Sequence, residues 1–268
     1  MATVTDTDIK REGLLRKMKN KEKAGRKFGF FCKTDEGKRS MIDFHAHILP
    51  GADHGSDSLE TSKAQLGYLF NEGITKVVAT PHFYPQRHSV DKFLERRELA
   101  KKELLTLNRA EVPEVYLGAE VLVCGGIDHM EGIEGLCIEG TDVILLEMPF
   151  HTFREEHYEA VYRIGRMGLR PVMAHVDRYP AEDIARLCEE CDVMCQINAE
   201  VLSGFGGSKR LSKLFDTCNI VAFGSDIHGS DKKAARSLAK LYKKTGDAGG
   251  EVLDSSRDLL ADAKNIFE

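Results

Sequence analysis

The 268-residue chain contains no apolar run that reaches the roughly 18 residues needed to span a bilayer. No apolar stretch precedes its basic N-terminal region, which argues against a signal peptide. Its seven cysteines are odd in number and irregularly spaced, unlike a disulfide framework. We therefore expect a cytoplasmic location, reduced thiols and no stable membrane insertion.

The chain also lacks an overall positive charge. Its net charge is −5, while residues 1–40 contain twelve Lys or Arg and six Asp or Glu, so the remaining 228 residues carry −11. An acidic body argues against binding to nucleic acid. We interpret residues 1–40 as a basic extension, either a solvated tail or a contact for an acidic partner, and residues 41–268 as one domain.

From residue 41 onward, short apolar segments alternate with longer amphipathic ones. The expected strands cover 41–45, 74–82, 114–120, 142–149, 170–178, 193–198 and 220–228. The expected helices cover 56–73, 89–109, 154–167, 180–191, 207–217, 231–244 and 256–267. This alternation indicates a parallel α/β fold, either a barrel or a doubly wound sheet. The glycine-rich phosphate loop typical of the doubly wound sheet does not follow the first strand.

Histidines and carboxylates stand at the carboxyl ends of most of these strands. Parallel strands bring such positions to one face, where bare buried charges would need compensation by cations. Imidazole and carboxylate ligands without cysteine suit Mn²⁺, Fe²⁺ or Zn²⁺. Nine ligands are enough for two or three ions, and they are His45, His47, His54, His82, Glu120, Glu147, His175, Asp226 and His228.

A centre of several metal ions predicts hydrolysis of phosphate esters, because such ions lower the pKa of water and hold phosphoryl oxygens. Arg178, three residues after His175, is placed to bind the phosphate with its guanidinium. Lys233 is a second candidate cation near the last strand, and Arg87 follows the second strand. Each of these cations could equally be a solvated surface residue.

The motifs "DFHAH", "ATPH", "GAE", "LLEMP", "AHVDRY" and "GSDIH" occur in this order and resemble the PHP (polymerase and histidinol phosphatase) superfamily. "HILPGADHG", "ATPHFYPQR", "QINAEVLSGFGG" and "LLADAKNIF" are similar to its metal-dependent protein-tyrosine phosphatases of bacterial capsule and exopolysaccharide operons. The resemblance covers about residues 41–267. It implies a distorted (β/α)7 TIM-like barrel, a trinuclear centre that commonly uses Mn²⁺, and a phosphotyrosine substrate on a bacterial tyrosine kinase.

The same resemblance implies how the ligands are shared. His45, His47, Glu120 and Asp226 would hold one ion. Glu120 would bridge to a second ion held also by Glu147 and His175, while His54, His82 and His228 would hold the third. Asp43 is expected to form a hydrogen bond to a histidine rather than to bind metal.

The chain departs from the pattern of that family in three places. Asp53-His54 replaces two adjacent acids, Val176-Asp177 replaces Pro-Glu before Arg178, and Lys233 stands near the place of an arginine. These differences bear on substrate choice more than on phosphatase chemistry.

Two other functions remain open from the sequence, as does the oligomeric state. One is a phosphatase of a small metabolite such as histidinol phosphate or a nucleotide, and the other is a weakly active regulatory protein that binds a kinase. Catalysis by a cysteine nucleophile is unsupported, because no cysteine has an arginine six positions later. Cys188, Cys191 and Cys195 are expected to be core or surface thiols, with a redox site as the alternative.

Overall fold

Residues 40–150 and 153–268, which the computed structural model describes, contain nine short strands that all pair in parallel within two sheets. The first sheet has the order β1 (Met41–Ala46), β2 (Ile74–Ala79) and β4 (Glu114–Leu117). The second has the order β3 (His82–Phe83), β5 (Glu120–Leu122), β6 (Val143–Glu147), β7 (Arg170–Met173), β8 (Met194–Asn198) and β9 (Ile220–Gly224).

The two sheets continue each other, because β3 follows β2 and β5 follows β4 after a break of two residues. Across the breaks the Gly118 amide donates to the Ala79 carbonyl at 2.8 Å, and the Glu120 amide donates to the Pro81 carbonyl at 3.1 Å. Pro81 itself cannot donate to a ladder, which interrupts the strand at this point. Nine strands therefore occupy seven strand positions.

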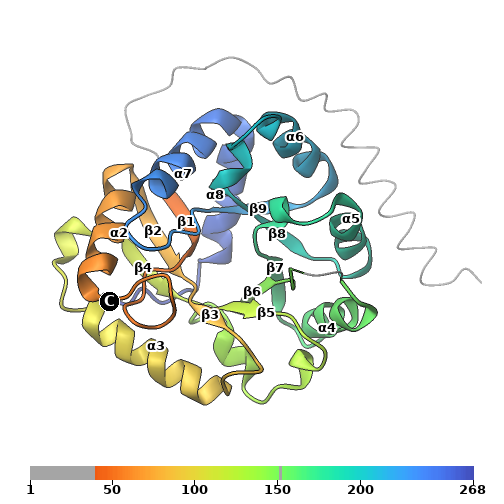
Figure 1. Cartoon of the computed structure of the whole chain (residues 1–268), viewed down its shortest axis with the longest axis horizontal. Coiled ribbons are helices and arrows are strands. Elements are labelled where there is room, and N and C mark those ends of the chain that lie inside the picture. The colour runs from red at the N-terminus through yellow and green to blue at the C-terminus, as the bar shows by residue number, and fades with distance from the viewer. Residues whose placement is uncertain (1–39, 151–152) are drawn as a thin grey trace, which may run out of the picture. The chain divides into compact units, whose positions relative to one another are not determined.

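The first and last positions are also joined. The Asp226 amide donates to the His45 carbonyl at 2.8 Å, and the His47 amide donates to the Ile227 carbonyl at 3.2 Å. Figure 1 shows the strands at the centre and the helices around them. The predicted α/β fold of TIM-like barrel type is confirmed.

Seven α-helices lie in the described part of the chain, and most of them connect consecutive strand positions. Between β5 and β6, however, only two 3₁₀ turns replace the helix, which distorts the ring. The α-helices are α2 (Leu59–Asn71), α3 (Val90–Leu104), α4 (Glu155–Arg166), α5 (Ala181–Glu190), α6 (Gly207–Thr217), α7 (Lys232–Thr245) and α8 (Asp247–Leu259). The 3₁₀ segments are η1 (Arg109–Glu111), η2 (Ile127–His129), η3 (Ile133–Leu136), η4 (Val176–Arg178) and η5 (Ala199–Leu202).

The apolar core includes side chains from the strands and from the inner faces of the helices. Phe44, Phe83 and Phe223 of the strands and Phe93 of α3 are almost completely buried. Polar groups are buried as well, among them Asp43, His45, His47, Gln196 and Asn198 on or next to β1 and β8. Buried polar groups need partners, so their contacts indicate where the barrel carries its chemistry.

Several expected elements have different bounds, and the helix expected over 89–109 ends at Leu104. The strand expected over 170–178 ends at Met173, and the one over 220–228 ends at Gly224, since His175 and Asp226 have φ of 33° and 51°. The helix expected over 256–267 lies instead at Asp247–Leu259. The residues after Leu259 that were expected to continue the helix contact other segments instead. For example, the Ile266 amide donates to the Val115 carbonyl at 2.9 Å.

The basic extension predicted over residues 1–40 lies outside the described residues except for Ser40. Among the helices of the described residues, none is long and apolar enough to cross a membrane.

Candidate metal centre

Predicted ligands from six of the seven strand positions lie together at the carboxyl end of the barrel. They converge because parallel strands present their carboxyl ends on the same face. β8 contributes supporting amides in place of a predicted ligand. The eight residues joined by close contacts are His45, His47, His82, Glu120, Glu147, His175, Asp226 and His228.

Glu120 occupies the middle of this cluster. Its Oε2 lies 2.8 Å from His82 Nδ1 and 3.3 Å from Nε2 of both His45 and His47. Its Oε1 accepts a hydrogen bond of 2.8 Å from His175 Nε2. Burial alone would raise the pKa of Glu120, but the charge of His45 and hydrogen bonds from these histidines lower it well below its usual value. Glu120 is therefore an ionised carboxylate in the position of a bridge.

Asp226 also lies beside the β1 histidines. Its Oδ1 lies 3.2 Å from His47 Nε2 and 3.8 Å from His45 Nε2. Its Oδ2 accepts from Asn198 Nδ2 at 2.9 Å and pairs with Arg178 at 2.7 Å. Burial raises the pKa of Asp226, but nearby His45 and His47 lower it below its usual range.

The rings of three histidines are oriented by hydrogen bonds from Nδ1. His47 donates to Asp53 Oδ2 at 2.7 Å, His45 to Gln196 Oε1 at 3.2 Å, and His228 to the Asp226 carbonyl at 3.0 Å. Each bond fixes the ring so that Nε2 is the nitrogen left for a cation.

The ligand atoms fall into three overlapping groups, within each of which they lie no more than 4.8 Å apart. Several of these atoms are buried and form no hydrogen bond of good geometry: His82 Nδ1, Glu120 Oε2 and His228 Nε2. Such atoms are costly unless a cation binds them, so the residues present fit metal ions. The groups are His45–His47–Asp226, His82–Glu120–Glu147 and His47–His82–His228.

These groups resemble the predicted sharing of ligands without matching it throughout. In the third group His47 takes the place expected for His54. The His54 ring is exposed but stacks on His82 at 4.9 Å and lies 4.8 Å from His228, measured between ring centroids. His175 contacts both carboxylates of the second group, lying 3.5 Å from Glu147 Oε1. His54 and His175 thus stay predicted ligands at the edge of the groups.

Two predicted ligands have an uncommon backbone conformation. His175 and Asp226 adopt positive φ, as Asp192 outside the cluster also does, and this is uncommon for residues other than glycine. The surrounding contacts hold them there, because the His175 amide donates to Gln196 Oε1 at 2.8 Å. Strained residues held in this way are typical of functional sites.

The predicted phosphate-binding cations differ in their positions. Arg178 is one-third exposed and borders the cluster, where its guanidinium pairs with Asp226 and lies 3.3 Å from Glu200 Oε2. Lys233 is exposed in the first turn of α7, and its described hydrogen bond is from its backbone amide to Asp231. Arg87 lies over the Tyr84 ring, at 5.2 Å from its centroid.

The residues that support the cluster were missed or only partly anticipated from the sequence. Asp53 accepts from His47 and from the amides of His82 and Gly55, at 2.7, 2.9 and 2.8 Å. Gln196 Oε1 accepts hydrogen bonds from His45 Nδ1 and from the His175 amide. The signal that could have identified Gln196 is an amide in the middle of the apolar strand "VMCQIN".

Asp43 differs from its expected role in detail. It accepts hydrogen bonds from the backbone amides of His45, at 3.3 Å, and of Ser225, at 2.8 Å. It therefore ties β1 to the segment after β9 and does not orient an imidazole.

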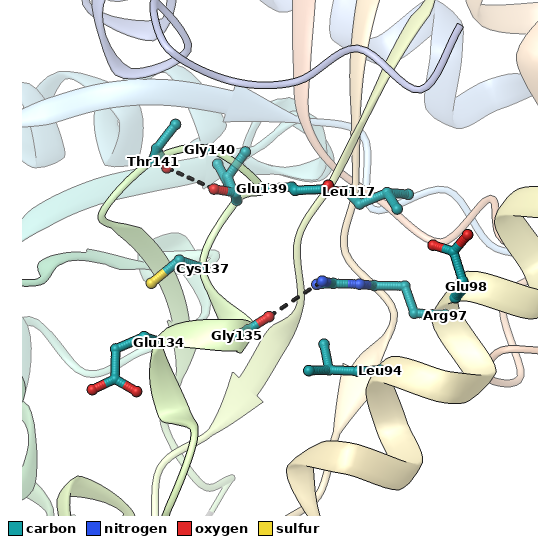
Figure 2. Close-up of a pocket in the computed structure, with 11 residues that line it drawn as sticks. Leu94, Arg97, Glu98, Leu117, Glu134, Gly135, Cys137, Glu139, Gly140 and Thr141 are labelled. Atoms are coloured by element: carbon teal, nitrogen blue, oxygen red, sulfur yellow. Dashed lines mark hydrogen bonds between the residues drawn. The ribbon is translucent and has the colours of Figure 1, made fainter.

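A separate cavity of about 350 Å³ lies beside α3, where η3 replaces a barrel helix (Figure 2). Arg97 extends into it and donates to the carbonyls of Gly118 and Gly135, at 3.0 and 3.2 Å. None of the predicted ligands lines this cavity. Arg97 satisfies backbone groups there, so we assign the cavity a structural origin and not a part in the metal cluster.

The fold and the cluster define the class of the protein: a parallel α/β barrel whose strand ends form a candidate centre for several metal ions. Residues 41–256 match the capsular polysaccharide synthesis family CpsB/CapC, and the chain belongs to this family. The predicted resemblance is thereby confirmed.

Curated relatives cover most of the domain. The chain is 30% identical over 213 residues to tyrosine-protein phosphatase CpsB of Streptococcus pneumoniae, covering 72% of this chain and 85% of that protein. It is 31% identical over 202 residues to the putative tyrosine-protein phosphatase CapC of Staphylococcus aureus, covering 70% and 77%.

Solved structures support the fold. One from a study of YwqE from Bacillus subtilis and CpsB from Streptococcus pneumoniae, described as metal-dependent tyrosine phosphatases, matches with a TM-score of 0.68 and 23% identity over 84% of this chain and 96% of that one. A TatD-like protein from Archaeoglobus fulgidus matches with a TM-score of 0.50 and 16% identity over 82% and 99%.

Proposed function

We propose that this chain is a metal-dependent phosphoric monoester hydrolase that removes phosphate from tyrosine residues of a protein. The convergence of His and carboxylate side chains from six strand positions carries this proposal. Relatives that share about 30% of its residues over most of their length bear the name tyrosine-protein phosphatase.

The cluster would hold two or three divalent cations, and we favour Mn²⁺ over Fe²⁺ or Zn²⁺. Divalent cations in such a centre supply water of lowered pKa and neutralise the charge of the phosphate. Glu120 would bridge two of the ions, because both of its oxygens face imidazole nitrogens. The Nδ1 hydrogen bonds described above keep the His45 and His47 rings in the orientation that presents Nε2.

Arg178 would bind the phosphate of the substrate. Its guanidinium lies at the border of the cluster and is one-third exposed, so a phosphate could take over contacts that the carboxylates of Asp226 and Glu200 now make. We assign Lys233 a weaker electrostatic attraction for the phosphate, since its side chain is exposed in the first turn of α7.

The mouth of the cluster suits an aromatic phosphate ester. Half-buried Tyr84 stacks on His82 with ring centroids 5.2 Å apart, and Arg87 lies over the Tyr84 ring. A phosphotyrosine ring could pack beside this stack while its phosphate reaches the cluster. A phenol leaves more readily than an aliphatic alcohol because its pKa is about 10.

Exposed aromatic side chains at the same face favour a protein substrate over a small metabolite. Phe150 follows β6 and is 77% exposed, and Phe205 follows η5 and is fully exposed. Exposed aromatic groups near a site are typical of protein contacts. We propose a bacterial tyrosine kinase that regulates polysaccharide synthesis as the partner, and the cytoplasm as the location.

The test compares substrates with purified protein loaded with Mn²⁺. We expect hydrolysis of p-nitrophenyl phosphate and of a phosphotyrosine peptide, and a much lower rate on histidinol phosphate. A clear preference for histidinol phosphate would overturn the choice of substrate. Absence of turnover in fully metallated protein would favour a regulatory binder.

A variant with His45→Ala and His47→Ala should lose both metal and activity. His129→Ala is the matched control, because His129 is a surface histidine whose side chain is 72% exposed. Retained activity in the double variant would refute the assignment of the centre.

A further inference from the structure

Three cysteines from three different elements meet on the outer side of the barrel wall. Cys188 belongs to α5, Cys195 to β8, and Cys218 follows α6 directly. Their sulfur atoms all lie within 4.8 Å of one another, and those of Cys188 and Cys195 are 3.9 Å apart. The fold thus assembles a cluster of three thiols, which we call the thiol cluster.

The thiol cluster is distinct from the metal centre at the strand ends. Neighbouring residues of a strand point to opposite faces. Gln196 contacts His45 inside the barrel, so the preceding residue, Cys195, points outward toward the helices. The described groups of candidate ligands share no residue between the two places.

The spacing of the sulfur atoms fits a metal ion. A zinc–sulfur bond is about 2.3 Å long, so sulfurs around one ion lie about 3.8 Å apart in a tetrahedral arrangement and about 4.0 Å apart in a trigonal one. The 3.9 Å between Cys188 and Cys195 lies between these values. Cys195 and Cys218 are buried and Cys188 is half-buried, so an ion could reach the cluster from the Cys188 side.

The composition of the thiol cluster supports the same reading. Three sulfur atoms, with no carboxylate or imidazole among them, form a soft set of ligands. Soft cations prefer such ligands.

The neighbouring "CEEC" pattern is not the binding unit. Cys191 turns away, and its thiol donates to the Tyr158 carbonyl at 3.5 Å. Burial raises the pKa of Cys191 to about 11. A site built from Cys188 and Cys191 is therefore disfavoured, although their spacing in the sequence suggests one.

We propose that Cys188, Cys195 and Cys218 bind one thiophilic cation of the zinc class, independently of the histidine and carboxylate centre. Water on the half-exposed side would complete a tetrahedral arrangement. The site requires neither the proposed phosphatase activity nor its metal ions.

The experiment titrates the full chain with Cd²⁺, which gives a thiolate charge-transfer absorption that histidine and carboxylate ligands do not give. The protein is kept reduced with a phosphine and freed of metals beforehand. We expect the absorption to saturate at one equivalent of Cd²⁺. It should remain in the variant with His45→Ala and His47→Ala, and its absence in the unmodified chain would overturn the proposal.

Cys188→Ser should abolish the absorption, and Cys191→Ser is the matched control that should keep it. Full absorption in Cys188→Ser would overturn the site. A second measurement needs no variant: Zn²⁺ should protect half-buried Cys188 from maleimide labelling, as located by mass spectrometry, while half-buried Cys124 serves as the internal control. Equal labelling with and without Zn²⁺ would also count against it.

Discussion

Replacing Asp53 by asparagine tests whether this residue positions the metal centre. The carboxylate accepts three N–H groups, from His47 Nδ1 and from the amides of His82 and Gly55. Asparagine has one oxygen and one NH₂ group, so at least one of these donors must face another donor. Loss of the carboxylate also removes the charge that makes His47 a stronger ligand. Substitutions of this kind lower metal affinity about 10- to 100-fold, which corresponds to about 1.4 to 2.7 kcal/mol.

The assay measures phosphatase rate against Mn²⁺ concentration, together with the thermal midpoint with and without Mn²⁺. We expect the half-saturating Mn²⁺ concentration to rise 10- to 100-fold and much of the rate to return at saturating Mn²⁺. Asp57→Asn is the control, because Asp57 is exposed and bonds the Thr61 hydroxyl at 2.6 Å. An unchanged Mn²⁺ dependence in Asp53→Asn would refute the positioning role.

Three further predictions concern packing, phosphate binding and protons. Gly224→Ala would place a Cβ atom 2.6 Å from that of His45, so we expect a loss of about 1–3 kcal/mol in denaturant unfolding together with lower activity. In contrast, Gly165→Ala in α4 has its nearest contact at 3.9 Å and should gain about 0.5–1 kcal/mol; equal effects would contradict the packing argument. Arg178→Lys should raise KM for a phosphotyrosine peptide about 10-fold, a cost of about 1.4 kcal/mol, because lysine keeps the charge but not the planar pair of donors. An unchanged KM would show that Arg178 does not bind the phosphate. Burial lowers the pKa of His175, but hydrogen bonds to Glu120 and Glu147 raise it to about 9. The stability that this proton adds to the metal-free chain is complete below about pH 6.5 and is lost as pH rises toward 9. Mn²⁺ affinity should rise over the same pH window because the ion displaces the proton. A free energy of unfolding that stays constant across this window, in urea titrations of the metal-free chain, would contradict the predicted loss of stability.

Much of the fold could be predicted because it depends on local patterns. Alternating apolar strands and amphipathic helices indicated parallel pairing, and the motifs that resemble the PHP superfamily indicated a seven-unit barrel. Element ends were harder to place. The positive φ of His175 and Asp226 ends their strands early, and only contacts with other strands hold these residues in that conformation. The C-terminal segment around Ile266 similarly follows its pairing with β4 and not its helical pattern.

The sequence alone determined which residue types stand at the strand ends, and therefore the kind of chemistry expected there. Its local spacing carries that information, because parallel strands always present their carboxyl ends on one side. Only the tertiary structure decided how the side chains share space. It placed His47 beside His82 and His228, brought Asp53 and Gln196 behind the β1 histidines, and left Lys233 exposed at the rim.

The cysteines show the same division. Their number and spacing in the sequence indicated reduced thiols, with a redox site at Cys188, Cys191 and Cys195 as the alternative. The fold instead separates Cys191 from Cys188 and joins Cys188 to Cys195 and Cys218. Contacts between residues of α5, β8 and the end of α6 depend on how helices pack around the barrel, and that packing is decided by the whole core and not by any short stretch of sequence.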